Sequence, residues 1–277
     1  MGFVFIAAWP FPHNYDESKI QTLSALEHIR KRTGMYIGRV GDGTQYDDGI
    51  YVLLKEVVDN AVDEFIMGYG KHIEITIDGP KVRVRDYGRG IPLGKVVECV
   101  SQINTGAKYN DDVFQFSVGL NGVGTKAVNA LASQFLVQSH RDGKFAGARF
   151  VRGELHKELA GKSPDEKNGT LIEFEPDPVI FGTVVYDDEL VLRRLRLYAC
   201  LHAGLTIHYN GQEIVSEEGL TDLILEEVGD EAVYGPLHYR SPTLEIAFTH
   251  TPRFNETFFS FVNGQYTVDG GTHLSAF

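Results

Sequence analysis

Cysteine, methionine and tryptophan are scarce in this sequence, which holds two cysteines, three methionines and one tryptophan among 277 residues. The two cysteines, Cys99 and Cys200, lie far apart and share no metal-ligand spacing, so we interpret both as reduced, buried, small apolar side chains rather than as metal ligands. The apolar stretch at residues 1–10 is short and lacks a basic leader, which argues against a signal peptide or a membrane span. These absences predict a cytoplasmic protein without a membrane partner.

Positive charge is also in short supply. The sequence holds 26 lysines and arginines against 38 aspartates and glutamates, a net charge of -12. Such a chain repels a polyanion on average, so contact with nucleic acid would need a local basic patch. The two basic runs, residues 30–32 and 193–196, are more typical of helix C-termini, where cations complement the helix dipole. Hydrophobic residues at 43% and charged residues at 23% indicate a soluble globular protein and exclude wholesale disorder.

Apolar periodicity predicts an α+β protein in which helices cover one face of a mostly antiparallel sheet. The strands are expected at residues 72–77, 81–85, 135–139, 145–151, 169–174 and 205–209, and the helices at 18–32, 53–66, 96–103, 125–131 and 187–200. Residues 36–49 and the charged segment 157–168 are expected to be loops. The pattern restarts after Ser216 with a helix at 220–228 and strands at 244–250 and 257–262, which predicts the incomplete start of a second domain.

The helix expected at residues 53–66 has an unusual polar face. At roughly 100° per residue, Glu56, Asp59, Asn60, Asp63 and Glu64 fall within an arc of about 140°. Carboxylates at these spacings repel one another, so the helix needs something positive beside them. A divalent cation is one hypothesis, and a solvated acidic face is the alternative.

Two glycine-containing segments could bring backbone close to a ligand. Asp86 ends an expected strand and is followed by Gly88 and Gly90, which suits the approach of a flat ligand, although a simple turn explains the same pattern. The run Gly119–Gly124 opens a helix, where backbone N–H groups and the helix dipole bind phosphate. Its spacing fits neither a Rossmann fingerprint nor a Walker A loop. Residues 104–116 contain one lysine, Lys108, and are typical of a mobile flap.

Together, and in this order, these motifs resemble the GHKL ATPase family, in particular the ATP-binding B subunits of bacterial type IIA DNA topoisomerases, namely DNA gyrase and topoisomerase IV. The resemblance covers Tyr15 to Phe277. It rests on residues 15–20, 30–38, 56–64, 86–92, 119–124, 169–170 and 269–274. The form of residues 118–126 favours topoisomerase IV, with gyrase as the alternative.

The resemblance implies a Bergerat-type two-layer sandwich, ATP and Mg²⁺ as cofactors, and a role for each matching residue. Glu56 would be the catalytic base, Asn60 the protein ligand of Mg²⁺, and Asp86 with Thr170 the partners of the adenine amino group. The remaining assignments follow from the same resemblance: Gly88, Ile91 and Pro92 line the base pocket; Gly119, Leu120, Gly122, Val123, Gly124 and Lys108 contact the phosphates; Arg89 and Arg141 border a pocket for aminocoumarin-like inhibitors; Tyr15, on an N-terminal arm, reaches the partner's nucleotide.

The same resemblance implies the domain boundaries and the wider function. Residues 1–13 would be an N-terminal extension, 14–215 the ATPase domain and 216–277 part of a transducer domain. ATP-driven homodimerisation would clamp DNA for strand passage, together with a DNA-cleaving A subunit. Alternatives are another GHKL protein, such as a histidine kinase or a chaperone or mismatch-repair clamp, and a nucleotide-binding module without hydrolysis.

This sequence departs from the family pattern at three places. Thr33 stands where the family usually has proline, and the segment between Pro92 and Val96 is shorter than in many relatives. The chain also stops at Phe277, before the lysine that reaches the γ-phosphate in the family. The first two departures affect loop stiffness and flap closure, and the third predicts slow turnover.

Overall fold

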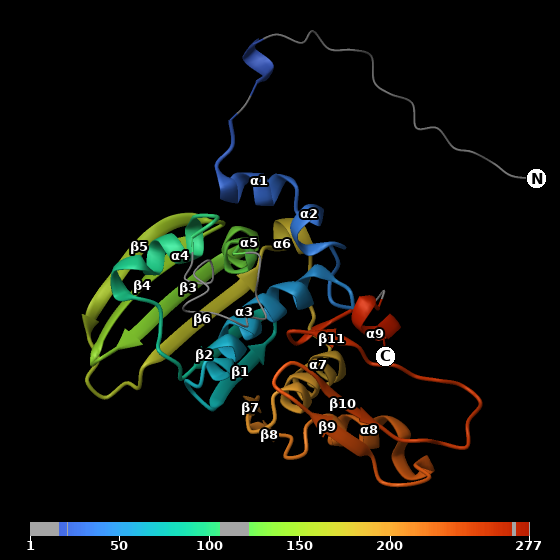
Figure 1. Ribbon diagram of the computed structural model, residues 1–277. Helices are drawn as coiled ribbons and strands as arrows, with labels where there is room; N and C mark the ends of the chain where they lie inside the picture. The colour runs from blue at the N-terminus through green and yellow to red at the C-terminus, as the bar shows by residue number, and fades with distance from the viewer. Residues whose placement is uncertain (1–16, 21, 106–121, 268–269, 277) are drawn as a thin grey trace, which may run out of the picture.

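The computed structural model describes residues 17–20, 22–105, 122–267 and 270–276. An eight-stranded sheet dominates it, in the order β5-β4-β3-β6-β2-β1-β7-β8 (Figure 1). Neighbouring strands are antiparallel except for β1 and β7, which run parallel. The strand bounds are His72–Asp78 (β1), Lys81–Asp86 (β2), Ala132–Arg141 (β3), Lys144–Val151 (β4), Glu154–Lys162 (β5), Gly169–Pro176 (β6), Thr206–Tyr209 (β7) and Gln212–Ile214 (β8).

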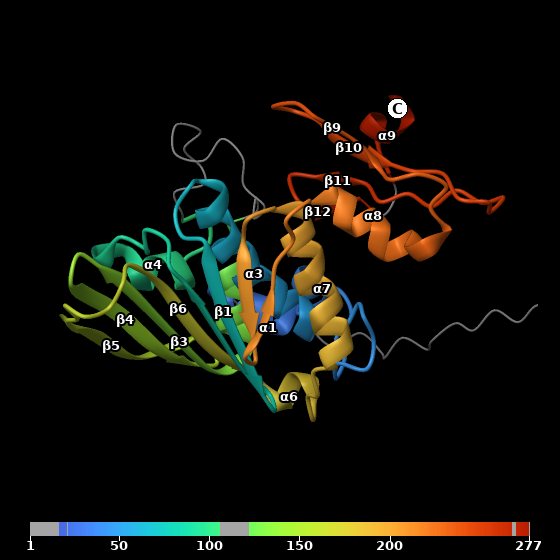
Figure 2. The ribbon, with the colours of Figure 1, turned by 90° about the horizontal axis from the view of Figure 1, so that it is seen from below.

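Helices pack along this sheet, which confirms the expected α+β class (Figures 1 and 2). Their bounds are Ala25–Lys31 (α1), Gly34–Ile37 (α2), Gly49–Ile66 (α3), Val96–Ser101 (α4), Gly124–Leu131 (α5), Pro178–Phe181 (α6) and Asp188–Leu201 (α7), with short 3-10 turns at Glu17–Lys19 and Leu93–Lys95. The long helix α3 packs its apolar face against β2 and β6. Its buried side chains include Leu54, Val58 and Val62, so the hydrophobic effect fixes which way its polar residues point.

The hairpin β1–β2 forms as its alternating pattern predicts. Ile75 lies opposite Val84, both side chains are buried, and Gly79 adopts a positive φ of 55° in the turn between the strands. The last pair of the hairpin is Ile73 with Asp86. Asp86 therefore stands at the end of a central strand, where the sheet backbone holds it rigidly.

The predicted helix at residues 18–32 is wrong in its first half. Helix α1 begins at Ala25 because Ser24 caps it: the Ser24 hydroxyl accepts from the Glu27 amide at 3.3 Å, and the Glu27 carboxylate accepts from the Ser24 amide at 2.7 Å. This reciprocal capping satisfies N–H groups that a longer helix would bond internally. Within the segment predicted as a loop at 36–49, the short helix α2 extends to Ile37 and α3 starts at Gly49.

The loop predicted at residues 157–168 is also wrong, because Glu154–Lys162 forms the edge strand β5. All but one of its residues are exposed, so the strand carries no apolar alternation for a pattern to reveal. Charged side chains such as Lys157, Glu158 and Lys162 are typical of edge strands, where they discourage pairing with other chains.

Residues after Ser216 form a second, smaller unit next to α7 (Figures 1 and 2). Helix α8 (Leu220–Val228) matches its prediction, and the remaining elements are a 3-10 turn Gly229–Glu231, β9 (Leu237–Arg240), β10 (Glu245–Phe248), β11 (Phe261–Val262), β12 (Gln265–Tyr266) and α9 (Thr272–Ala276). The strand predicted at 257–262 shrinks to β11, and β9 was not expected. Among the described residues of this unit no hydrophobic side chain is buried. None of the described helices is long and apolar enough to cross a membrane.

A buried ion pair ties α1 to α6. The Asp177 carboxylate, fully buried, accepts from Arg30 Nη2 at 2.6 Å and Arg152 Nε at 3.0 Å, and it caps α6 through the Val179 amide at 3.1 Å. Burial opposes ionisation here, but the hydrogen bonds from Arg30 and Val179 and the charge of Arg30 hold the pKa of Asp177 below its ordinary value. The pair therefore anchors three segments at one point.

We expect Asp177→Ala to lower the free energy of unfolding by about 1.5–3 kcal/mol, because it removes the buried acceptor shared by Arg30, Arg152 and the Val179 amide. The matched control is Asp187→Ala, since Asp187 caps α7 through the Glu189 and Leu190 amides but is exposed and pairs with no arginine of the described chain. That control should cost about 1 kcal/mol. Urea unfolding of both variants checks the difference, and equal losses would contradict it.

Candidate active site

Helix α3 and the start of α5 meet at one end of the site. A Cβ placed on Gly124 would lie 1.7 Å from Glu56 Oε2, so the Glu56 carboxylate lies directly against the first turn of α5 and only glycine fits there. Asn60 Nδ2 donates to the Glu56 carbonyl at 2.6 Å and to Thr125 Oγ1 at 3.0 Å. This end combines a carboxylate, an amide and a helix N-terminus, the groups that suit phosphate and water.

Two of the remaining acids of α3 are paired with basic side chains of the protein itself. Asp59 is buried and bonded to Lys55 Nζ at 2.5 Å, and Glu64 accepts from Arg89 through the backbone N at 2.7 Å, Nε at 3.1 Å and Nη2 at 3.0 Å. Lysine and arginine thus supply the positive charge that the spacing required. The described residues contain no cluster of three or more His, Cys, Asp or Glu side chains suited to a metal ion.

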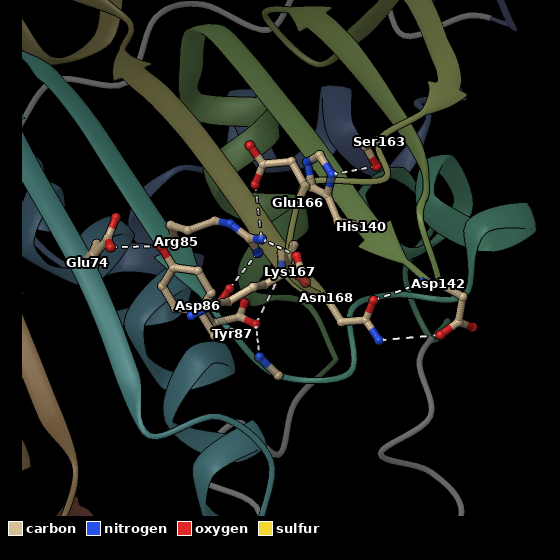
Figure 3. A network of polar contacts seen from close by, with 12 residues as sticks. Glu74, Arg85, Asp86, Tyr87, His140, Asp142, Ser163, Glu166, Lys167 and Asn168 are labelled. Carbon is tan, nitrogen blue, oxygen red and sulfur yellow. Dashed lines mark hydrogen bonds and ion pairs between the residues drawn. The ribbon is translucent and has the colours of Figure 1, made fainter.

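Asp86 occupies the other end of the site, at the end of β2 (Figure 3). Its Oδ1 accepts from the Gly88 amide at 2.9 Å and the Thr170 amide at 3.1 Å, and no described residue donates to Oδ2. Burial raises the pKa of Asp86 to about 6; the two amide bonds and Arg85 oppose this shift, and Glu64 adds to it. A buried carboxylate with one unused oxygen is poised to accept from a ligand amino group.

Arg85 holds the backbone of Asp86 in place, which the sequence pattern did not reveal. The buried guanidinium donates from Nη1 to the Asp86 carbonyl at 2.5 Å and from Nη2 to the Lys167 carbonyl at 2.6 Å (Figure 3). It also lies 4.7 Å from the centre of the Tyr87 ring, whose hydroxyl donates to Glu74 at 2.7 Å. The only signal for this role of Arg85 in the sequence is a charged residue next to the end of an expected strand.

The same helix α3 reaches both ends. A Cβ on Gly88 would lie 2.6 Å from the Glu64 side chain, so Glu64 packs against the turn that follows Asp86. Glu64 lies eight residues after Glu56, about 12 Å further along the helix. The two ends of the site are therefore built on one rigid element.

A shallow cavity of about 410 Å³ borders the Asp86 end and is lined by Pro92, Leu93, Arg141, Asp142 and Lys144. Arg141 Nη1 donates to the Gly90 carbonyl at 3.3 Å, and Ser139 Oγ donates to the Ile91 carbonyl at 2.6 Å. These bonds fix the turn 88–92 against β3. The predicted rim residue Arg141 thus lies at the cavity, while Arg89 is held by Glu64 and stacks 4.5 Å from the Tyr69 ring centre.

The structure brings together Glu56, Asn60, Thr125 and Gly124 at one end and Asp86, Gly88 and Thr170 at the other. Gly122, with φ 61°, and Val123 precede α5 directly. The predicted residues Tyr15, Lys108, Gly119 and Leu120 lie outside the described residues. Sequence reasoning missed Lys126, which is buried in the first turn of α5 and donates to the Thr105 carbonyl at 2.8 Å.

Comparisons with known proteins found relatives of this chain. Residues 45–179 match the family described as Histidine kinase-, DNA gyrase B-, and HSP90-like ATPase. The chain is 60% identical to the B subunit of DNA topoisomerase 4 from Borreliella burgdorferi and 35% identical to the B subunit of DNA gyrase from Thermotoga maritima, over 95% of this chain in each case. It spans 44% and 45% of those relatives, somewhat less than half of their length.

A solved structure is similar over most of the chain. It is the 43K ATPase domain of Thermus thermophilus gyrase B in complex with an aminocoumarin, with a TM-score of 0.75 and 31% identity. The match covers 92% of this chain and 70% of that one.

The raised pKa of Asp86 predicts that this residue reduces stability at neutral pH. The penalty is absent below about pH 4, grows as the pH rises to about 6 and stays at about 3 kcal/mol above that, because the folded state holds the proton more tightly. Asp86→Asn keeps an oxygen for the Gly88 and Thr170 amides. We therefore expect it to be more stable than the unchanged protein at pH 7.5 and equally stable near pH 4.

Urea unfolding across this pH range measures the effect. Asp78→Asn is the control, because Asp78 is exposed at the end of β1 and should give no change at any pH. An Asp86→Asn protein less stable than the parent at pH 7.5 would show that Asp86 has a structural role instead.

Proposed function

Since this chain belongs to the Histidine kinase-, DNA gyrase B-, and HSP90-like ATPase family, and within it to the ATPase regions of type IIA topoisomerase B subunits, we propose that the site described above binds ATP with Mg²⁺ and hydrolyses the γ-phosphate at Glu56. The observation that carries this proposal is the position of Glu56 and Asp86 at opposite ends of one site built on α3.

Adenine would bind at the Asp86 end. Asp86 Oδ2 accepts from the exocyclic amino group, while Oδ1 stays bonded to the Gly88 and Thr170 amides. Gly88 leaves room for the base, and Ile91 and Pro92 provide apolar contact beside it. The Thr170 hydroxyl assists through a water molecule. Recognition by a fixed carboxylate favours a base with an amino group at this position.

The phosphates would bind at the N-terminus of α5, where Gly122, Val123 and Gly124 present backbone N–H groups. Gly119, Leu120 and Lys108 are proposed to complete this contact. The chemistry of the groups at this end fits Mg²⁺, because amide and carboxylate oxygens are the hard ligands that this ion prefers. Asn60, whose Nδ2 donates to the Glu56 carbonyl and to Thr125 Oγ1, would hold Mg²⁺ through its amide oxygen. When bound, Mg²⁺ neutralises charge on the β- and γ-phosphates.

Glu56 would act as the general base. Its carboxylate orients a water molecule and takes a proton from it as the water oxygen attacks the γ-phosphorus. The bond from that phosphorus to the bridging oxygen breaks, ADP leaves, and inorganic phosphate forms. The α5 N-terminus stabilises the charge that spreads over the phosphate oxygens in the transition state.

The wider function is proposed by likeness. Residues 14–215 would form the ATPase domain, preceded by an extension at 1–13, and 216–277 would begin a transducer domain, consistent with the sparse packing of that unit. Two copies would dimerise on binding ATP, with Tyr15 of each arm at the other copy's nucleotide. The dimer would clamp DNA and work with a DNA-cleaving A subunit in the cytoplasm. Higher identity to the topoisomerase 4 relative favours topoisomerase IV over gyrase.

An inhibitor site is proposed at the cavity beside the base pocket. The relative from Thermus thermophilus was solved with an aminocoumarin. Here Arg141 lines the cavity next to Pro92, and Arg89 stands on the turn between them and Asp86. A guanidinium group beside the apolar side chains of Pro92 and Leu93 suits a flat ligand with polar substituents.

We expect Glu56→Gln to lower ATP hydrolysis by roughly 10²–10⁴, the usual contribution of a positioned base, while ATP affinity stays within a few-fold. Glu158→Gln is the control, since Glu158 is an exposed residue on β5 and should leave both quantities unchanged. Phosphate release and nucleotide titration measure the two effects. Hydrolysis at the parent rate in the Glu56→Gln protein would remove Glu56 from this role.

We expect Asp86→Asn to weaken ATP binding at least tenfold, because it turns an acceptor into a donor facing the adenine amino group, a mismatch of about 1–3 kcal/mol. Calorimetric titration with a non-hydrolysable ATP analogue, with and without Mg²⁺, measures the loss. The same protein should be at least as stable as the parent at pH 7.5, so lost binding with intact folding identifies a direct contact. An unchanged affinity for the ATP analogue would contradict the assignment of Asp86 to the adenine pocket.

A further inference from the structure

We infer that Tyr198 and Gln265 are positioning residues for ATP turnover, which hold helix α3 in register through the buried carboxylate of Asp59. The inference rests on the proposed hydrolysis at Glu56 and adds two residues that lie outside the nucleotide site. Tyr198 belongs to α7 and Gln265 to β12, in the unit that follows Ser216.

Asp59 is the meeting point of three separate elements. Its side chain is 2% exposed although the residue lies one position before Asn60 and three after Glu56. Oδ2 accepts from Lys55 Nζ at 2.5 Å and from Gln265 Nε2 at 3.2 Å, and Oδ1 accepts from the Tyr198 hydroxyl. Lys55 is on α3 itself, so among the contacts of Asp59 it is those from Tyr198 and Gln265 that join α3 to other elements.

Such a carboxylate is better suited to fixing register than to adding stability. Removing a carboxylate from water costs several kcal/mol, which hydrogen bonds and a nearby cation largely offset, so the net gain in stability is small. The Tyr198 hydroxyl remains a donor at neutral pH, because burial and the Asp59 charge hold the pKa of Tyr198 well above its ordinary value. The arrangement therefore has one satisfied geometry, and any slide of α3 breaks it.

The position of α3 matters for turnover because Glu56 has little room. Its carboxylate lies against Gly124 closely enough that a methyl group would overlap it. A shift of about 1 Å in a reacting group can cost as much as 10²-fold in rate. Asp59 is about one turn of helix from Glu56, so whatever fixes Asp59 also fixes the water-activating oxygen.

Gln265→Met tests the role of the second unit, because it keeps the length of the side chain and removes its donor. We expect turnover to fall by roughly threefold to tenfold, with the KM for ATP within about twofold, since the adenine pocket is untouched. Gln212→Met is the matched control: Gln212 is an exposed glutamine on β8, and its replacement should change neither quantity. If Gln265→Met only reduced the amount of folded protein, turnover per folded molecule would stay at the parent value. That result would overturn the inference.

A swap of hydrogen-bonding groups makes the test specific. Asp59→Asn keeps Oδ1 for Tyr198 but turns an amide NH₂ toward the donors of Gln265 and Lys55, so turnover should fall further. Adding Gln265→Glu supplies an acceptor for that amide, and we expect the double variant to recover at least half of the lost rate. Losses that simply add in the double variant would show that the two side chains are not coupled.

Amide hydrogen exchange separates this inference from the proposed function. Without nucleotide, Gln265→Met should speed exchange of amides in residues 56–63 by about threefold to tenfold, and Gln212→Met should not. Absence of hydrolysis in the unchanged chain would count against Glu56 as base, while the exchange measurement still decides whether Gln265 holds α3. Unchanged exchange in Gln265→Met would overturn the inference whatever the turnover.

Discussion

The packing of one face of α3 against the sheet is the constraint on which the rest of this structure depends. Because Leu54, Val58 and Val62 pack in the core, the acidic side chains between them point away from the sheet and contact other elements. Glu56 turns to the first turn of α5, Asp59 to α7 and β12, and Glu64 to Arg89. One hydrophobic stripe thereby decides the position of the Glu56 carboxylate, the junction with the second unit and the packing of Glu64 against the turn that follows Asp86.

Two buried aspartates show how the partner decides the role of a carboxylate. Asp177 meets two arginines, remains ionised and anchors α1 to α6. Asp86 meets two backbone amides, while Arg85 directs its donors to carbonyls, so burial is the largest effect and the pKa of Asp86 rises to about 6. The arrangement at Asp177 stabilises the fold. The arrangement at Asp86 weakens it, because burial disfavours a carboxylate that no cation pairs with among the described residues, as is common at functional sites.

Local signals predicted much of this fold. The β1–β2 hairpin and helix α8 follow from alternation and helical periodicity, which are properties of neighbouring residues. Strand β5 was missed because its pairing with β4, not its own pattern, makes it a strand. At the site, motifs and family likeness indicated Glu56, Asn60 and Asp86, whereas the roles of Arg85 and Gln265 depend on contacts 82 and 206 residues away in sequence, which no local pattern contains.

The shared helix also links the nucleotide to the second unit in energetic terms. A ligand that binds more tightly when α3 is in one position shifts α3 toward that position. The effect of one binding event on the free energy of the other equals the reverse effect. If ATP favours the register in which Glu56 faces the α5 N-terminus, the same register favours the contacts of Asp59 with Tyr198 and Gln265. The contact of the unit after Ser216 with α3 then alters nucleotide affinity by the same factor as the nucleotide alters that contact, and a KM that stays within about twofold in Gln265→Met would mean that this factor is small. No separate relay is required, because one rigid helix carries both sets of groups.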